Sequence, residues 1–387
     1  MNMKTEPGSA AEQAGPRTRM LVIATLGFAV TFWAWALISP LAPSLATKLG
    51  LSSFQQSLIV AVPVIVGSLG RIPIGALTDR FGGRLMLPIV SVATIVPVLF
   101  LAFFGDQSLA TLLIGGFFLG IGGTSFAVGV PFVSAWFPPE RRGLAIGIFG
   151  VGMVGTAISA FTTVRLVELG SSATPFLVTA AALAVYAVVA WLLLRDAPGQ
   201  VRPTTSMAKR VGETLKLGVT WQAAALYATL FGGYVAFSVY LPSLLKAEYD
   251  LSIADASNRM AGFVILAVIM RPVGGFLSDK IGPVPVLATC LGAVVFGALI
   301  DATSPALFPI ATIAYLVMAA GLGAGSGATF ALVALLSPAG KVGSVTGVVG
   351  AAGGLGGFVP PLLMGVVYGA TGSYTIGFLL LALVAAA

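Results

Sequence analysis

Apolar segments of about twenty residues recur along the whole chain, and this pattern leaves few folds open to it. A helix of that length crosses a hydrocarbon core about 30 Å thick. The sequence is 58% hydrophobic and 9% charged, whereas soluble domains carry about 25% charged residues. Only helices and closed barrels satisfy the backbone in lipid, and these segments lack the alternation of barrel strands. The sequence therefore predicts an all-α polytopic membrane protein.

Twelve apolar segments can be placed, at 20–42, 56–77, 85–104, 109–135, 143–165, 174–194, 219–245, 256–277, 284–301, 306–336, 342–368 and 373–387. They predict two six-helix bundles, 20–194 and 219–387, joined by a polar cytoplasmic linker at 195–218. Residues 1–19 are expected to be a cytoplasmic tail, because they lead into a full-length span without a convincing signal-peptide cleavage site. The last segment is shorter than about twenty residues, so its helix is expected to be truncated.

Lysine and arginine are distributed unevenly between the two sides of the predicted bundles. Fourteen of the twenty lie in the N-terminal tail, the linker and every second loop, and only four lie on the opposite side. By the positive-inside rule, both termini are expected in the cytoplasm and the chain in the inner (plasma) membrane. The net charge of +7 therefore reflects orientation. The expected surroundings are membrane lipid, and nucleic-acid binding is not expected.

The composition also argues against several kinds of chemistry. The chain has no histidine and a single cysteine, Cys290. Metal sites, histidine-based catalysis and an intrachain disulfide are therefore not expected. Without histidine, and with the carboxylates only in tails, loops and helix ends, no set of nucleophile, base and acid can be assembled, so an enzyme is not expected. We expect a monomer without cofactor or metal.

Two arginines, Arg71 and Arg271, lie inside apolar segments and are 200 residues apart. Each precedes an aspartate by eight residues, and the two flanking sequences match at Gly, Leu, Asp, a basic residue and Gly. Glycines of the fifth and eleventh segments repeat at the same offset: Gly143, Gly147 and Gly150 match Gly343, Gly347 and Gly350. These matches predict two pseudo-symmetric halves with glycine faces along a central seam, a known plan of transporters.

Each arginine is expected near the middle of the membrane, about 12 Å along a helix from its aspartate. A guanidinium does not lose its proton, and its insertion there costs about 2.5 to 3.5 kcal/mol, so intramembrane charge is functional by default. A structural ion pair lacks a partner in the apolar segments, and snorkelling is less attractive for two arginines at equal depth. Two unpaired guanidiniums predict a small, planar, oxygen-rich anion as ligand. The lack of a mid-membrane proton carrier favours anion exchange over proton symport.

Two loops resemble the signature of the major facilitator superfamily, which occurs between spans two and three and again between spans eight and nine. The residues that carry this resemblance are Gly75, Asp79, Arg80, Arg84, Gly275, Asp279 and Lys280. The resemblance implies a twelve-helix fold, with the aspartates and basic residues latching the two bundles on the cytoplasmic side. Ordinary turn chemistry with positive-inside anchors would also account for the charges.

Within that superfamily, segments 122–147 and 351–361 resemble those of the nitrate/nitrite porters. The resemblance implies that Arg71 and Arg271 clamp the anion, and that three aromatic residues shape the pocket: Phe126, Tyr227 and Phe231. It also implies that glycines serve helix packing and gating: Gly143, Gly147, Gly150, Gly152, Gly353, Gly354, Gly356 and Gly357. Aromatics four residues apart could instead be simple packing.

One position departs from the porter pattern, since Met153 stands where these porters usually have asparagine. A thioether cannot donate a hydrogen bond. The sequence predicts a secondary active transporter of a small anion, with nitrate and nitrite favoured, working by alternating access and exchange. A carrier of another small anion, such as an organic carboxylate, and a non-transporting anion sensor remain as alternatives.

Overall fold

The computed structural model describes residues 14–198, 207–337 and 342–387. These ranges are helical, and they contain no strand. Eleven of the described helical segments are long and apolar enough to cross a membrane, and the shorter apolar helix Thr375–Ala386 follows them. The predicted all-α polytopic fold is thus confirmed.

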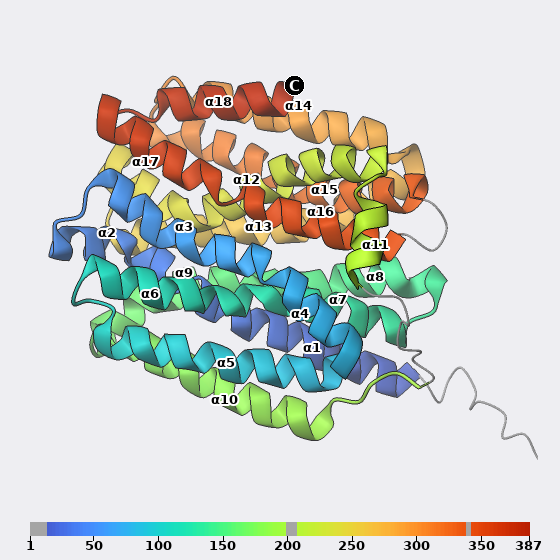
Figure 1. Ribbon diagram of the computed structural model, residues 1–387. Coiled ribbons are helices and arrows are strands. Elements are labelled where there is room, and N and C mark those ends of the chain that lie inside the picture. The colour runs from blue at the N-terminus through green and yellow to red at the C-terminus, as the bar shows by residue number, and fades with distance from the viewer. Residues whose placement is uncertain (1–13, 199–206, 338–341) are drawn as a thin grey trace, which may run out of the picture.

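The helices fall into two sequential halves (Figure 1). The N-terminal half contains α1 (Ala14–Trp35), α2 (Ile38–Leu49), α3 (Ser53–Leu69), α4 (Arg71–Phe81), α5 (Gly83–Phe104), α6 (Leu109–Leu119), η1 (Gly120–Thr124), α7 (Ser125–Trp136), α8 (Pro139–Gly150), η2 (Val151–Val154), α9 (Gly155–Leu169) and α10 (Thr174–Leu193). The C-terminal half contains α12 (Gly218–Tyr249), α13 (Ile253–Ile281), α14 (Pro283–Asp301), η3 (Leu307–Ala311), α15 (Thr312–Leu336), α16 (Val342–Gly356), α17 (Val359–Thr371) and α18 (Thr375–Ala386).

A short helix, α11 (Met207–Thr214), lies between the halves at one end of the molecule, which we call the linker end (Figure 1). The opposite end, where α2 and α14 finish, is called the far end. The polar composition of 195–218 indicated a linker but not a helix inside it. Eight residues make a helix that is marginal in isolation, and α11 packs against α16.

Five spans are interrupted along their length, which hydropathy did not predict, and four of them are interrupted at glycine-containing segments. Glycine is the common cause, since it lowers helix propensity by about 1 kcal/mol relative to alanine. The span α6–α7 tightens to a 3₁₀ turn at η1, whose sequence is Gly-Ile-Gly-Gly-Thr, and α8–α9 tightens likewise at η2. Glycines also separate α3 from α4, at Gly70, and α16 from α17, at Gly357. Such tight turns leave backbone carbonyls available to side chains.

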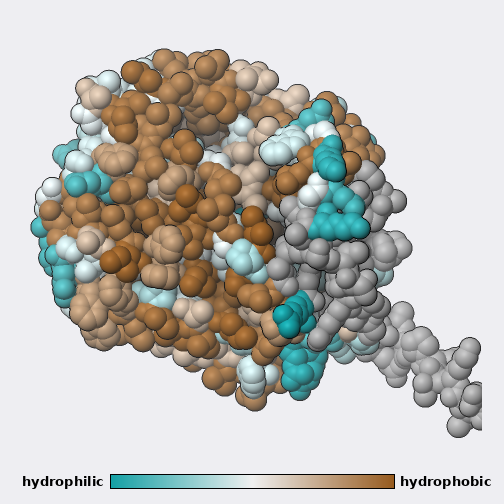
Figure 2. Space-filling view, viewed as in Figure 1, coloured by the Kyte–Doolittle hydropathy of each residue, from teal (hydrophilic) through white to brown (hydrophobic). Residues whose placement is uncertain are grey.

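The outer surface is apolar across the middle of the molecule and hydrophilic at its ends (Figure 2). Large side chains there are well exposed, for example Val96 at 69% and Trp191 at 57%. A contiguous apolar surface of this kind marks contact with lipid, because monomeric soluble proteins rarely expose one. The chain is therefore a multi-pass membrane protein.

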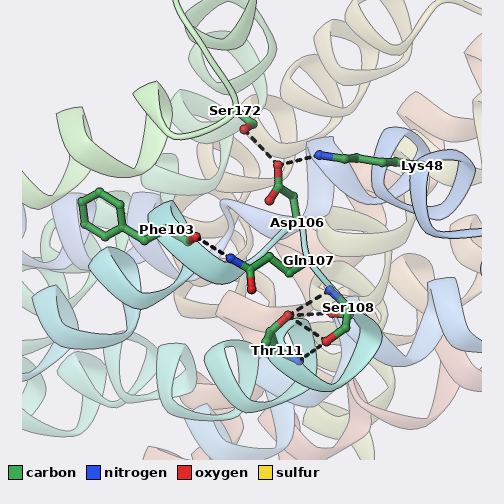
Figure 3. A network of polar contacts seen from close by, with 7 residues as sticks. All are labelled: Lys48, Phe103, Asp106, Gln107, Ser108, Thr111 and Ser172. Carbon is green, nitrogen blue, oxygen red and sulfur yellow. Dashed lines mark hydrogen bonds and ion pairs between the residues drawn. The ribbon is translucent and has the colours of Figure 1, made fainter.

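A polar network closes the far end of the N-terminal half (Figure 3). Lys48 of α2 contacts the Asp106 carboxylate at 2.6 Å, and the Ser172 hydroxyl donates to the same oxygen at 3.2 Å. The hydrogen bond from Lys48 lowers the pKa of Asp106. The network joins α2 to the turns that follow α5 and precede α10.

The two halves touch each other closely at the far end. The Ser39 hydroxyl of α2 donates to the Val239 carbonyl of α12, and Gly365 of α17 packs on Ser57 of α3. Towards the linker end, a Cβ at Gly147, Gly150 or Gly347, three glycines of the predicted central seam, would have no neighbour within 4 Å. The far end is therefore closed, while these glycine faces are not.

Candidate functional site

Arg71 lies at the first position of α4, where the glycine break turns its side chain into the molecule. It is 9% exposed. Its Nη1 donates to the Gly350 carbonyl at 2.9 Å, and its Nε donates to the Gly123 carbonyl at 3.3 Å. Gly350 belongs to the C-terminal half, so this arginine bonds across the junction between the halves.

Both carbonyl partners come from glycine-rich segments, and neither was predicted to bind an arginine. Gly123 lies in the 3₁₀ turn η1, and Gly350 lies in α16. Hydrogen bonds that involve a charged group contribute about 1.5 to 3 kcal/mol each. Neutral carbonyls can thus stabilise a buried guanidinium without cancelling its charge.

Arg271 lies in α13, which continues through this position, and it is only partly buried. Its Nη2 donates to the Tyr227 hydroxyl, and its Nη1 lies 2.7 Å from the Met153 sulfur. The hydroxyl of Tyr227 therefore has a partner, although the side chain is 1% exposed. Met153 belongs to the N-terminal half, so the second arginine also spans the junction.

One aromatic ring, that of Phe231, lies beside both arginines. Its centroid is 6.0 Å from the Arg71 guanidinium carbon and 5.3 Å from that of Arg271. Tyr227 stacks on this ring with centroids 4.7 Å apart, and Phe126 lies 5.4 Å from Arg71. Cation–π contacts of this kind contribute about 0.5 to 2 kcal/mol, more when desolvated. All five predicted binding residues are thus brought together.

No carboxylate is paired with either arginine in the part of the chain that the structure describes. The ion pairs found there, Lys48–Asp106 and Arg259–Asp255, lie elsewhere. Each guanidinium has five N–H donors, and each uses two in the contacts above. The free donors and the uncancelled charge can accept a small anion with several oxygens.

The open space at Arg71 is small in this conformation. A cavity of about 10 Å³ lies between the arginine and neighbours that include Trp35, Ser68, Val235 and Gly354. This volume is near the minimum for a single water molecule. Binding of a polyatomic anion beside Arg71 therefore requires side chains or helices to move.

The glycines of the porter-like segments have different neighbours. Of Gly353, Gly354, Gly356 and Gly357, it is Gly354 that abuts the other half, since a Cβ there would meet Ser68 and lie 3.2 Å from Arg71 Nη1. Others pack within their own half: Gly152 on Phe28; Gly353 on Tyr227 and Phe231; Gly356 on Ala228; Gly357 on Val235. Gly143 lies in α8, where its surroundings are outside the described side chains.

The loop-signature residues lie at the linker end. Arg80 lies over Phe81 at 5.3 Å and Lys280 over Phe276 at 4.5 Å, each on its own helix. The Arg84 backbone N–H donates to Asp196 at 3.0 Å, which ties the start of α5 to the beginning of the linker. Gly75 and Gly275 lie within α4 and α13, Asp279 is exposed, and the Asp79 side chain is outside the described residues. The expected latch stays a prediction.

A second polar contact between the halves lies near the site and was not predicted from the sequence. The Thr156 hydroxyl of α9 lies 3.3 Å from the Tyr234 hydroxyl of α12, and Tyr234 stacks near Phe231. A buried tyrosine one turn after Phe231 could have indicated a polar partner, because its hydroxyl needs one. The pairing itself depends on the approach of the two halves.

The chain matches the family model of the Major Facilitator Superfamily over residues 24–359. A crystal structure of a bacterial homologue of the human lysosomal transporter Spinster, inward-facing and unoccupied, has the same fold. It gives a TM-score of 0.73 at 20% identity over 94% of this chain and 84% of that one.

Curated relatives of similar length narrow the family. A probable nitrate/nitrite transporter, NarK2, from Mycobacterium tuberculosis is 49% identical over 93% of this chain and 92% of its own length. The nitrite extrusion protein of Bacillus subtilis is 36% identical over 95% of this chain and 91% of its own. A probable nitrate transporter, NarT, from Staphylococcus haemolyticus is 36% identical over 94% and 93%. These names are those of transporters, in agreement with the expectation that the chain is not an enzyme. The chain belongs to the nitrate/nitrite porter family of the Major Facilitator Superfamily.

Proposed function

We propose that this protein carries nitrate and nitrite across the membrane, exchanging one for the other. The observation that carries the proposal is the pair of guanidiniums, one from each half, that lie beside the same Phe231 ring without a carboxylate. Transport of a cation would need the opposite charge at this point. The names of the relatives supply the identity of the anion.

The anion binds between Arg71 and Arg271, using N–H donors that the carbonyl, tyrosine and thioether partners leave free. Phe126, Tyr227 and Phe231 form the walls and limit access of water. Two positive charges repel each other strongly where the surroundings are apolar, so the empty site resists closure. A bound anion removes this repulsion and lets both halves close around it.

Alternating access then proceeds by rocking of the halves around this site. The linker end faces the cytoplasm, as the distribution of lysine and arginine favours. In the present conformation the far end is closed through Ser39 and Val239, so the site would exchange with the cytoplasm. Opening of the far end moves the two halves relative to each other. The hydrogen bond from Arg71 to the Gly350 carbonyl must then break and be replaced.

A second candidate, a carrier of small organic carboxylates, is favoured by one observation. Met153, which faces Arg271, offers a weak acceptor and no donor for the third oxygen of nitrate. A carboxylate presents only two oxygens to the guanidiniums.

Counterflow in proteoliposomes tests both candidates. Labelled nitrite should enter vesicles loaded with nitrate, at equal pH on both sides, and should not enter vesicles loaded with chloride. Uptake driven by formate but not by nitrate would replace the proposed substrate with a carboxylate. Uptake that occurs only with a pH gradient would replace exchange with proton symport. Absence of any flux, with nitrate binding retained, would favour a sensor.

A further inference from the structure

Asp301, the last residue of α14, is a buried acid that the proposed transport cycle does not use. Its side chain is 2% exposed, and neither carboxyl oxygen has a hydrogen-bond partner. The side chain of Tyr315 in α15 is likewise buried. Tyr249, near the end of α12, interacts with the Tyr315 hydroxyl and electrostatically with Asp301. Three helices thus bring two phenolic hydroxyls and an unpartnered carboxyl together inside the far end of the C-terminal half.

Among the residues that the structure describes, no positive group is paired with the Asp301 carboxyl. Glu248 of α12 adds like charge to this cluster, and Arg259 of α13 is paired with Asp255 at 3.2 Å. The neighbouring segments η3 and α18 contain no titratable residue. The carboxyl also lies at the C-terminus of its helix, where the macrodipole disfavours an anion. Burial of an unpaired carboxylate costs several kcal/mol, so this packing suits a neutral carboxyl.

We propose that Asp301 is a proton-binding site that exchanges its proton with the far side of the membrane, with Tyr249 and Tyr315 completing its surroundings. One carboxyl and two phenolic hydroxyls supply too few anionic ligands for a divalent cation. A single proton, in contrast, removes the charge and gives the carboxyl a donor for a neighbouring hydroxyl oxygen.

The same site can report the external pH to the transport machinery, an extension that depends on the proposed function. Helix α12 runs without interruption from Tyr227 in the anion site, past the Val239 carbonyl that holds Ser39, to the Asp301 cluster. Loss of the proton leaves a carboxylate that must recover water, which separates the ends of α12, α14 and α15. Deprotonation therefore weakens the closed far end and shifts the protein towards opening there.

Infrared difference spectroscopy of the purified protein tests the proton site without any transported anion. The wild type at neutral pH should show the C=O band of a protonated carboxyl, and Asp301→Asn should lose it. Asp250→Asn is the matched control and should keep the band. Asp250 is an exposed acid that directly follows Tyr249, the last residue of α12. The same protonated-carboxyl band in the Asp301→Asn variant would overturn the proposal.

Exchange measured over a series of external pH values tests the consequence for transport. The wild-type rate should change severalfold as the external pH rises, and Asp301→Asn, which mimics the protonated form, should flatten this profile. Asp250→Asn should follow the wild type. A wild-type profile retained in Asp301→Asn, together with loss of the infrared band, would overturn the link to transport and leave the proton site standing. Absence of exchange in the wild type would instead refute the proposed function, while the infrared result would stand by itself.

Discussion

Arg71 and Arg271 occupy equivalent positions in the two halves, yet their surroundings differ. Arg71 begins a helix after a break, is 9% exposed, and bonds to two backbone carbonyls. Arg271 lies within an unbroken helix, is partly buried, and contacts the side chains of Tyr227 and Met153. A duplicated sequence has thus produced one arginine held by the backbone and one held by side chains. Both arginines bridge the halves, and we expect the first to depend on the backbone positions of both halves and the second on the side chains around it.

The largest expected effect comes from replacing the buried arginine. Arg71→Lys keeps the charge but loses the planar fork of the guanidinium. The lysine ammonium cannot bond to the carbonyls of Gly123 and Gly350 and also reach an anion. Loss of one or more charged hydrogen bonds predicts nitrate binding roughly 10- to 150-fold weaker. Arg271→Lys should weaken binding less, by roughly tenfold. Calorimetric titration with nitrate measures both.

Arg259→Lys provides the control, because its ion pair with Asp255 is exposed and remote from the site. Its affinity for nitrate should equal that of the wild type. Equal losses in Arg71→Lys and Arg271→Lys would show that the backbone-held and side-chain-held arginines are energetically equivalent. Unchanged binding in both would remove the clamp.

A smaller effect is expected where only the coupling role of Arg71 is disturbed. In Gly354→Ala the new methyl group meets Ser68 and approaches Arg71 Nη1. Overpacking of this kind costs about 1 to 3 kcal/mol. The exchange rate should fall by about tenfold, measured by nitrite counterflow. Gly262→Ala, at an exposed position of α13, should leave the rate unchanged, because its Cβ meets nothing within 4 Å. Equal rates in the two variants would contradict tight contact at Gly354.

The symmetric part of this site could be predicted from sequence, and the asymmetric part could not. Hydropathy and the 200-residue offset located both arginines and predicted the two halves. Charges within apolar segments and an internal duplication can both be recognised in the sequence itself. The Gly123 and Gly350 carbonyls were missed because they are backbone groups, freed by helix distortion and aimed by packing between halves. Asp301 is the last residue of the predicted segment 284–301, but its burial depends on neighbours from other helices, including α12 and α15.

The contact between Arg271 and Tyr227 gives a third way to separate the two arginines. Tyr227→Phe removes the hydroxyl that accepts from Arg271 and keeps the stacking on Phe231. The lost bond affects the anion only through the position of Arg271, so we expect nitrate binding to weaken by only part of its free energy, roughly two- to tenfold. Tyr186→Phe is the matched control, because its buried hydroxyl has no partner. A loss as large as that in Arg71→Lys would mean that Tyr227 contacts the anion itself.

The smallest expected effect concerns the sulfur atom beside Arg271. Met153→Asn provides an amide that can both accept from Arg271 and donate to a third anion oxygen, whereas the thioether only accepts weakly. One added hydrogen bond predicts nitrate binding about threefold tighter, with little change for formate, which lacks the third oxygen. Met153→Leu conserves volume and should bind nitrate like the wild type or slightly more weakly. Equal strengthening of formate and nitrate binding in Met153→Asn would mean that the amide orients Arg271 rather than contacting the anion. Anion binding by the side-chain-held arginine would then depend on its orientation as much as on its charge.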